Sequence, residues 1–291
     1  MRTVKRLLGR SLFASRLDAL LLRRAAVVVA FHRVQRGADV SDGLTVDPQT
    51  FEAFCEFFRR HFHVVPLSEL IGKLEKGRTP SRELAITFDD GYRDNFENAM
   101  PILENLGLPA TFFVVSGWIG TDVVPFWDRA LGVQHPWMTW DQIRTLKSKG
   151  FDIGAHTRTH VNLGTTSGAI AQDEIAGARA DLEVALSAPV ETFAYPFGGQ
   201  DNMTELNRQV VKAAGFRCCC SAFGGTITGK TDPFLLPRVP VTTWHLSPQH
   251  FGFDVALGRS VWCPETSTSA ATSPISTRQP VPHVPGKSHS C

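Results

Sequence analysis

The sequence predicts an α/β fold in which βα units surround a parallel sheet. Short runs rich in β-branched and aromatic residues alternate with stretches of helical periodicity over most of the chain. Several of these runs are apolar at nearly every position, as expected for strands covered on both faces. With 291 residues, of which 43% are hydrophobic, the chain can also bury a substantial core.

The predicted strands follow one another along the chain and number seven. They are residues 25–31, 84–88, 110–115, 151–156, 192–195, 216–221 and 236–241. Helices are predicted between them, and Asp47 and Ser68 are candidate N-caps for the first two. The later helices cover residues 95–106, 140–149, 167–186 and 204–214, and glycines end three of them at Gly107, Gly150 and Gly215.

The N-terminal segment, residues 1–24, holds seven basic residues and one acid, Asp18, among leucines at roughly helical spacing. We favour an amphipathic helix packed on the body, and the alternative is peripheral contact with an anionic membrane surface. The segment lacks the layout of a signal peptide, and the apolar run 25–31 is far shorter than the roughly 20 residues of a membrane span. These features favour a cytoplasmic or membrane-peripheral location.

Composition separates residues 25–262, the predicted domain, from residues 263–291. The latter contain five Pro, six Ser and four Thr and no aromatic residue, which predicts a disordered tail.

A net charge of +2 argues against nucleic acid as a partner. The six cysteines lack CxxC spacing and suit a reducing compartment, and the run Cys218 to Cys220 reads as buried strand because neighbours point to opposite faces.

Two adjacent carboxylates, Asp89 and Asp90, end the second strand and precede Gly91. At the carboxyl end of a parallel strand, side chains project toward the ligand-binding crevice. The two side chains should point in different directions, so that one can bind a metal while its neighbour handles a proton. An Asp-Gly turn with a helix cap is the purely structural alternative.

A histidine pair, His156 and His160, follows the fourth strand. Histidines four residues apart share one face of a helical turn and can reach one ion. Together with one strand-end aspartate they make three protein ligands, which leaves coordination positions open for water and substrate, as a catalytic metal site requires. A further loop, residues 193–199, could direct the Phe197 amide at an oxyanion, although by itself this signal is weak and favours an ordinary Pro-Gly loop.

In this order, Thr87-Phe88-Asp89-Asp90-Gly91, the histidine pair and Tyr195-Pro196-Phe197-Gly198 resemble the NodB-type polysaccharide deacetylases, carbohydrate esterase family 4. The resemblance covers roughly residues 25–245, and the family's distorted (β/α)7 barrel agrees with the seven strands. Trp127-Asp128 and Met138-Thr139-Trp140-Asp141 look like the same family. The expected substrate contacts are Trp127, which is a candidate for stacking on a sugar, Trp140, Tyr195 and Pro196.

The resemblance implies that Asp90, His156 and His160 bind one divalent metal, usually zinc, with cobalt or nickel able to substitute. Asp89 would be the general base, and the Phe197 N–H would help to hold the oxyanion. The implied reaction removes N-acetyl groups from an N-acetylhexosamine-containing polysaccharide or glycoconjugate and releases acetate. An O-acetyl ester or another linear amide would suit the same site, and a catalytically silent glycan-binding relative is the alternative outside enzymes.

The sequence departs from the commoner family pattern in two places. The family's late Leu-x-x-His-like motif, which supplies the acid, has no good match, and Tyr195 lies where an arginine is expected. His32, at the end of the first strand, is the favoured acid over His245, because the first strand of a closed barrel lies beside the last. This resembles the circularly permuted deacetylases that act on poly-N-acetylglucosamine. Arg238 could pair with and orient Asp89, or form an ordinary structural ion pair.

Overall fold

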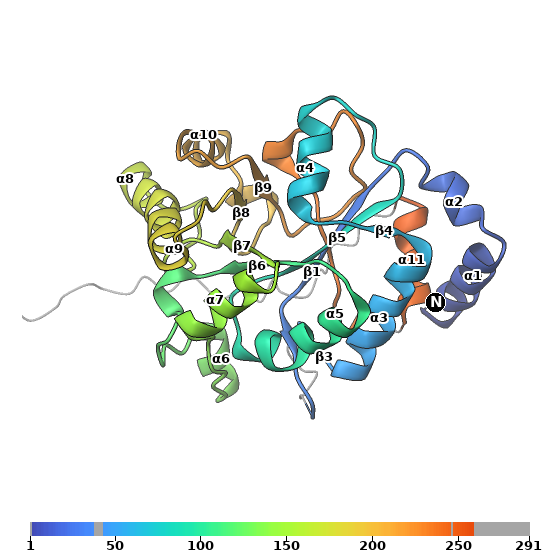
Figure 1. The fold of residues 1–291 in the computed structure, drawn as a ribbon, viewed down its shortest axis with the longest axis horizontal. Coiled ribbons are helices and arrows are strands. Elements are labelled where there is room, and N and C mark those ends of the chain that lie inside the picture. Colours follow the sequence, from blue (N-terminus) through green and yellow to red (C-terminus); the bar gives the residue numbers. More distant parts are fainter. Residues whose placement is uncertain (1, 38–42, 246, 259–291) are drawn as a thin grey trace, which may run out of the picture.

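The computed structural model describes residues 2–37, 43–245 and 247–258, and the predicted tail lies outside them. A parallel sheet with the strand order β10-β1-β5-β6-β7-β8-β9 organises the chain, and β4 pairs with β5 (Figure 1). Its strands are β1 (Val27–Phe31), β4 (His63–Val64), β5 (Glu83–Phe88), β6 (Thr111–Val114), β7 (Asp152–Ala155), β8 (Thr192–Ala194), β9 (Cys218–Cys220) and β10 (Val239–Pro240). All seven predicted strands are therefore confirmed.

The sheet curls into an incomplete barrel whose outer strands approach each other. Cys220, the last residue of β9, forms a parallel bridge with Leu236, three residues before β10. The Leu236 amide donates to the Cys219 carbonyl, and its own carbonyl accepts from Ser221. The fold is thus the predicted α/β class with seven parallel strands, consistent with a distorted barrel. A separate two-stranded sheet joins β2 (Arg33–Val34) to β3 (Thr45–Val46).

Helices surround the sheet (Figure 1). They are α1 (Arg2–Ala14), α2 (Leu17–Leu21), α3 (Pro48–His61), α4 (Leu67–Glu75), α5 (Met100–Leu106), α6 (Phe126–Leu131), α7 (Trp140–Ser148), α8 (Gly168–Gln172), α9 (Ala178–Leu186), α10 (Glu205–Ala213) and α11 (Pro248–Ala256). Single π-helical turns, Asn95–Ala99 and Asp173–Gly177, precede α5 and α9. Helices α6 and α11 had no sequence prediction.

Of the two predicted helix N-caps, one is confirmed and one is wrong. Asp47 caps α3 by accepting a hydrogen bond from the Thr50 amide at 2.9 Å, as expected. The prediction for Ser68 is wrong, because α4 begins one residue earlier, at Leu67 after Pro66. Inside the first turn the Ser68 hydroxyl is free to donate instead to Asp152 at 3.0 Å.

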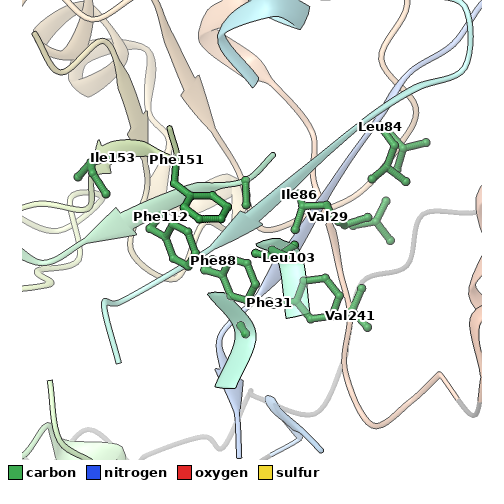
Figure 2. Close-up of a cluster of buried hydrophobic side chains, with 14 of the residues drawn as sticks. Val29, Phe31, Leu84, Ile86, Phe88, Leu103, Phe112, Phe151, Ile153 and Val241 are labelled. Carbon is green, nitrogen blue, oxygen red and sulfur yellow. The ribbon is translucent and has the colours of Figure 1, made fainter. Parts of the chain in front are cut away.

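A layer of aromatic side chains fills the space between the sheet and the helices on one side. Phe31, Phe88 and Phe112 come from three adjacent strands, with ring centroids 5.6 and 4.8 Å apart (Figure 2). On the opposite face of the sheet, Cys218 and Cys220 pack with Phe113 and with α4. Cys219 lies on the same face as the aromatic layer. The cysteine run therefore alternates between the two faces of the sheet, as predicted.

The N-terminal segment forms two helices rather than one, separated by Arg16 in the left-handed region at φ 61°. Helix α1 packs against α11, and Lys5 forms an ion pair with Asp254 at 2.8 Å. Across the described ranges, every helix is too short or too polar to cross a membrane.

Candidate metal centre

Two strand ends bring the candidate ligands together. Asp89 and Asp90 follow β5, His156 follows β7, and His160 lies four residues further along the same loop. Strands β5 and β7 flank β6 in the sheet, so their carboxyl ends lie close to each other. The site therefore arises where parallel βα folds place ligand-binding residues.

Asp90, His156 and His160 form a compact set of potential ligands. The Nε2 atoms of His156 and His160 lie 3.4 and 3.3 Å from Asp90 Oδ1, and one ligand atom from each residue lies within 4.8 Å of the others. Asp90 Oδ1 is buried and forms no hydrogen bond within the described part of the chain. A buried carboxylate oxygen facing two imidazole nitrogens fits a divalent cation. Burial alone would raise the pKa of Asp90, but the two imidazoles outweigh it and hold that pKa well below its usual range.

The surrounding backbone orients both histidines. His156 Nδ1 lies 2.8 Å from the Ala194 carbonyl, which turns Nε2 toward Asp90 and favours the tautomer that can bind a metal. The His160 ring stacks on Trp118, with centroids 5.4 Å apart. Thr157 accepts a hydrogen bond from the His160 amide at 2.9 Å and so closes the turn between them.

The prediction that the two histidines share a helical turn is wrong. Residues 157–160 form a loop in which Thr157 and His160 have φ values of 62° and 58°. Glu174 holds this conformation by accepting hydrogen bonds from the amides of Arg158 and Thr159, both at 2.9 Å. The histidines therefore converge through a left-handed turn that a distant carboxylate stabilises, and not through helical periodicity.

Strained backbone gathers at this site. Among the described residues, seven other than glycine have positive φ, and four of them are Asp90, Thr157, His160 and Phe197. Each left-handed side chain costs about 1 kcal/mol or more, which the surrounding hydrogen bonds must offset. Such clustering is typical of sites whose geometry is set by function.

Asp89 points away from Asp90 and toward Arg238, as the sequence predicted for adjacent strand-end residues. Arg238 Nη1 and Nη2 donate to the two Asp89 oxygens at 2.7 Å each, and Arg238 Nε donates to the Ser221 carbonyl at 2.5 Å. Arg238 is fully buried. Burial would raise the pKa of Asp89, but the guanidinium charge outweighs it and keeps that pKa below its usual value.

The two candidate acids lie in different surroundings. His32 directly follows β1, beside Asp89, whose amide donates to the Phe31 carbonyl at 2.9 Å. Burial lowers the pKa of His32, against the opposing pull of Asp90 and Asp89. His245 instead packs against His250 and Phe251, with centroids 5.5 and 5.3 Å away, and burial lowers its pKa to about 3. The structure therefore brings His32, and not His245, to the carboxylates.

Aromatic side chains border the triad on one side. Trp127 and Phe197 contact the His160 ring at centroid distances of 4.9 and 4.8 Å. Phe197 is 45% exposed, and no described residue accepts a hydrogen bond from its amide. Pro196 is buried next to it. Trp127 and Phe197 therefore both lie beside the triad.

Two expected substrate contacts lie elsewhere. Tyr195 is 1% exposed and packs in the outer core against Phe193, at a centroid distance of 5.1 Å. Side chains two residues apart on a strand lie on the same face of the sheet, and Tyr195 follows β8 directly, so its side chain lies on the same face as that of Phe193. Trp140, the first residue of α7, is half-buried against the same core. Neither side chain joins the group around the triad.

Sequence reasoning missed an aromatic cluster that supports Trp127. The Tyr92 hydroxyl accepts a hydrogen bond from Trp127 Nε1 at 3.1 Å, and the Tyr92 and Trp137 rings stack at 4.5 Å. Trp118 completes the cluster by packing on Trp137 at 4.7 Å. Tyr92 follows the Asp-Asp-Gly segment directly, and this proximity was the one signal in the sequence that could have identified it.

Comparisons with known proteins agree with this site. The family model described as polysaccharide deacetylase matches residues 76–219. YxkH of Bacillus subtilis is 24% identical over 220 residues, covering 74% of this chain and 71% of its own. The poly-β-1,6-N-acetyl-D-glucosamine N-deacetylase of Staphylococcus aureus (strain MRSA252) is 22% identical over 240 residues, covering 75% and 79%.

Two solved structures share the fold. The Streptococcus pyogenes deacetylase PplD, in complex with acetate, aligns with a TM-score of 0.66 at 19% identity over 78% of this chain and 96% of its own. IcaB from Ammonifex degensii aligns with a TM-score of 0.64 at 20% identity over 78% and 97%. The match to the family model spans all three motifs, and the solved structures share the barrel. The chain therefore belongs to the polysaccharide deacetylase family, the NodB-type carbohydrate esterase family 4.

Proposed function

We propose that this protein is a metal-dependent hydrolase that removes N-acetyl groups from an N-acetylhexosamine-containing polysaccharide or glycoconjugate. One observation carries the proposal. A carboxylate fixed by a buried arginine, Asp89, lies next to a separate carboxylate, Asp90, that faces two histidines. This division supplies a base and a ligand set at one edge of the sheet, which amide hydrolysis by an activated water requires.

Asp90, His156 and His160 would hold one divalent ion, which we assign as zinc, with cobalt or nickel as substitutes. When bound, such an ion polarises an acyl carbonyl and acidifies water. Asp89 is the proposed general base. The Arg238 charge keeps it ionised near neutral pH and prevents it from turning toward the ligand set.

The remaining groups assist at the acyl carbon and at the leaving nitrogen. The Phe197 N–H would donate to the oxygen that becomes negative when water adds. His32 would then protonate the departing amine, because it lies at the carboxyl end of β1 beside Asp89. Trp127, with Pro196 and the exposed ring of Phe197, would contact the sugar.

The amino-sugar substrate is supported by the chemistry of one curated relative. The Staphylococcus aureus protein is named for deacetylating poly-β-1,6-N-acetyl-D-glucosamine, and it covers three quarters of this chain. The position of His32 on the first strand supports the same substrate class, because it matches the permuted arrangement that the sequence resembles. We therefore propose β-1,6-linked N-acetylglucosamine oligomers as the first substrates to test.

The proposal is tested by measuring acetate release from these oligomers by the zinc-loaded protein and by Asp89→Asn. The wild type should release acetate, and the variant should lose about 10²- to 10⁴-fold in kcat while it binds metal as before. Release from O-acetylated xylan alone would assign an esterase instead. If neither form releases acetate from either polymer with metal bound, the protein is a glycan-binding relative and the enzyme assignment is wrong.

A further inference from the structure

Helix α1 presents an apolar stripe to solvent, on the side opposite the residues that pack against the protein. Val4, Leu7 and Leu8 are 57%, 54% and 49% exposed, and their spacing places them on one face. The opposite face carries buried Gly9 and the inward-pointing Lys5. A helix that served only to cover the core would not also present an apolar stripe to solvent.

The inward face is nevertheless firmly attached. A Cβ on Gly9 would lie 1.9 Å from the Gln249 carbonyl oxygen, so α1 and α11 cross in close backbone contact. Phe13 inserts beside Phe57 at a centroid distance of 4.8 Å. Lys5 is only 12% exposed in its ion pair with Asp254. The outward leucines therefore stand on a fixed support.

Helix α2 also exposes apolar side chains. Leu17, Leu20 and Leu21 are 52%, 58% and 49% exposed, and both helices lie at the same edge of the molecule (Figure 1). We call the six exposed large apolar side chains of α1 and α2 the leucine face. Its members are Val4, Leu7, Leu8, Leu17, Leu20 and Leu21.

The charges around the leucine face have one sign. Five arginines of the segment are exposed, namely Arg2, Arg10, Arg16, Arg23 and Arg24. Its one acid, Asp18, is fully buried and pairs with Arg82 at 3.0 Å. The exposed charges of this segment are therefore all cationic and lie among exposed apolar side chains, a combination that complements an anionic lipid headgroup layer above acyl chains.

We propose that the leucine face docks this protein on an anionic membrane surface, with α1 and α2 lying in the plane of the interface. The inference is independent of the proposed catalytic function. Arg82, the partner of Asp18, directly precedes β5, whereas the metal centre follows the other end of that strand. Docking through α2 would therefore leave the metal centre at the far end of the barrel, open to water and to a glycan.

The test is co-sedimentation of the full chain with phosphatidylcholine vesicles that contain or lack phosphatidylglycerol. We expect binding that requires the anionic lipid and falls as salt is raised. The double variant Leu7→Ser/Leu8→Ser should bind vesicles roughly tenfold more weakly than the wild type, since it loses side chains that enter the bilayer. Arg10→Gln should weaken binding roughly fivefold.

The matched control is Val184→Ser/Leu206→Ser, which alters equally apolar side chains, 82% and 72% exposed, on α9 and α10. It should bind vesicles like the wild type. Equal sedimentation of the wild type with and without phosphatidylglycerol would overturn the proposal. So would a wild-type dimer that the Leu7→Ser/Leu8→Ser variant converts to monomers without any vesicle binding, because the face would then join two copies.

Discussion

Arg238 donates one hydrogen bond of 2.7 Å to each carboxylate oxygen of Asp89, which lies 149 residues away in sequence. The same guanidinium donates through Nε to Ser221 and through Nη1 to Thr87 at 3.1 Å. Arg238 thus ties the segment leading into the last strand to β5, on which the metal centre is built. We propose that Arg238 takes over the task of the arginine that the family pattern places in the proline motif.

Replacing Arg238 by lysine should reduce turnover. Lysine keeps the charge but lacks the fork that fixes both oxygens, so Asp89 would be ionised and poorly oriented. We expect kcat to fall about 10- to 100-fold, with metal affinity changed little. Steady-state kinetics and a metal titration measure both quantities. Unchanged kcat in a folded variant would reduce Arg238 to a structural ion pair.

Metal binding should depend on the histidine pair. Elemental analysis of the purified protein should find about one divalent ion per chain, and His156→Ala should lose it, because two ligands do not hold a catalytic metal well. His63→Ala is the matched control, since this histidine is exposed on β4 and away from the triad. A wild type that takes up no zinc at neutral pH would remove the basis for the hydrolase proposal.

The role of His32 can be separated from that of Asp89 by the choice of leaving group. An amine must be protonated as it departs, whereas the phenolate of 4-nitrophenyl acetate leaves without an acid. His32→Gln should therefore lose about 10²- to 10⁴-fold on the N-acetylated glycan and much less on the ester. Asp89→Asn should lose activity on both, because both reactions need the water activated.

Equal losses on the two substrates in His32→Gln would argue against an acid and for a positioning role. His245→Gln provides the comparison for the alternative acid. Its imidazole lies against α11, and both of its ring nitrogens lack partners among the described residues. The glycan-to-ester activity ratio should therefore stay at the wild-type value in this variant.

The part of the site that lies at strand ends could be predicted from the sequence. Asp89, Asp90 and His156 directly follow apolar runs, and parallel strands bring such residues to one edge whatever the loops do. The histidine loop could not be predicted, because its left-handed turn depends on Glu174, more than a dozen residues downstream. Four-residue spacing suggested a helical turn only because it is the generic way to bring two side chains together.

The side chains beyond the strand ends were predicted less well for a related reason. The direction of the Tyr195 side chain depends on where the extended backbone of β8 ends. Because the extended backbone continues for one residue beyond β8, the Tyr195 ring packs in the core on the same face of the sheet as Phe193. The cluster of Tyr92, Trp118 and Trp137 joins three loops, and no local pattern links them. Tertiary packing, which sequence periodicity does not encode, decides both cases.

Stability should depend on the buried ion pair between Glu83 and Lys73, which are 2.6 Å apart. Burial would raise the pKa of Glu83, but the hydrogen bonds from Lys73 and the Ser81 amide outweigh it and lower that pKa. A lowered pKa adds stability above the unfolded value, about 4.3, that is lost as pH falls through the folded value. Urea unfolding should find Glu83→Gln about 1–3 kcal/mol less stable at pH 7, with the difference shrinking below about pH 4.

Glu69→Gln is the control, because Glu69 is half exposed and contacts the same lysine at 3.3 Å, so it should change stability by about 0.5 kcal/mol or less. A deficit in Glu83→Gln that stayed constant down to pH 3 would mean that packing, and not the charge of Glu83, stabilises this end of β5.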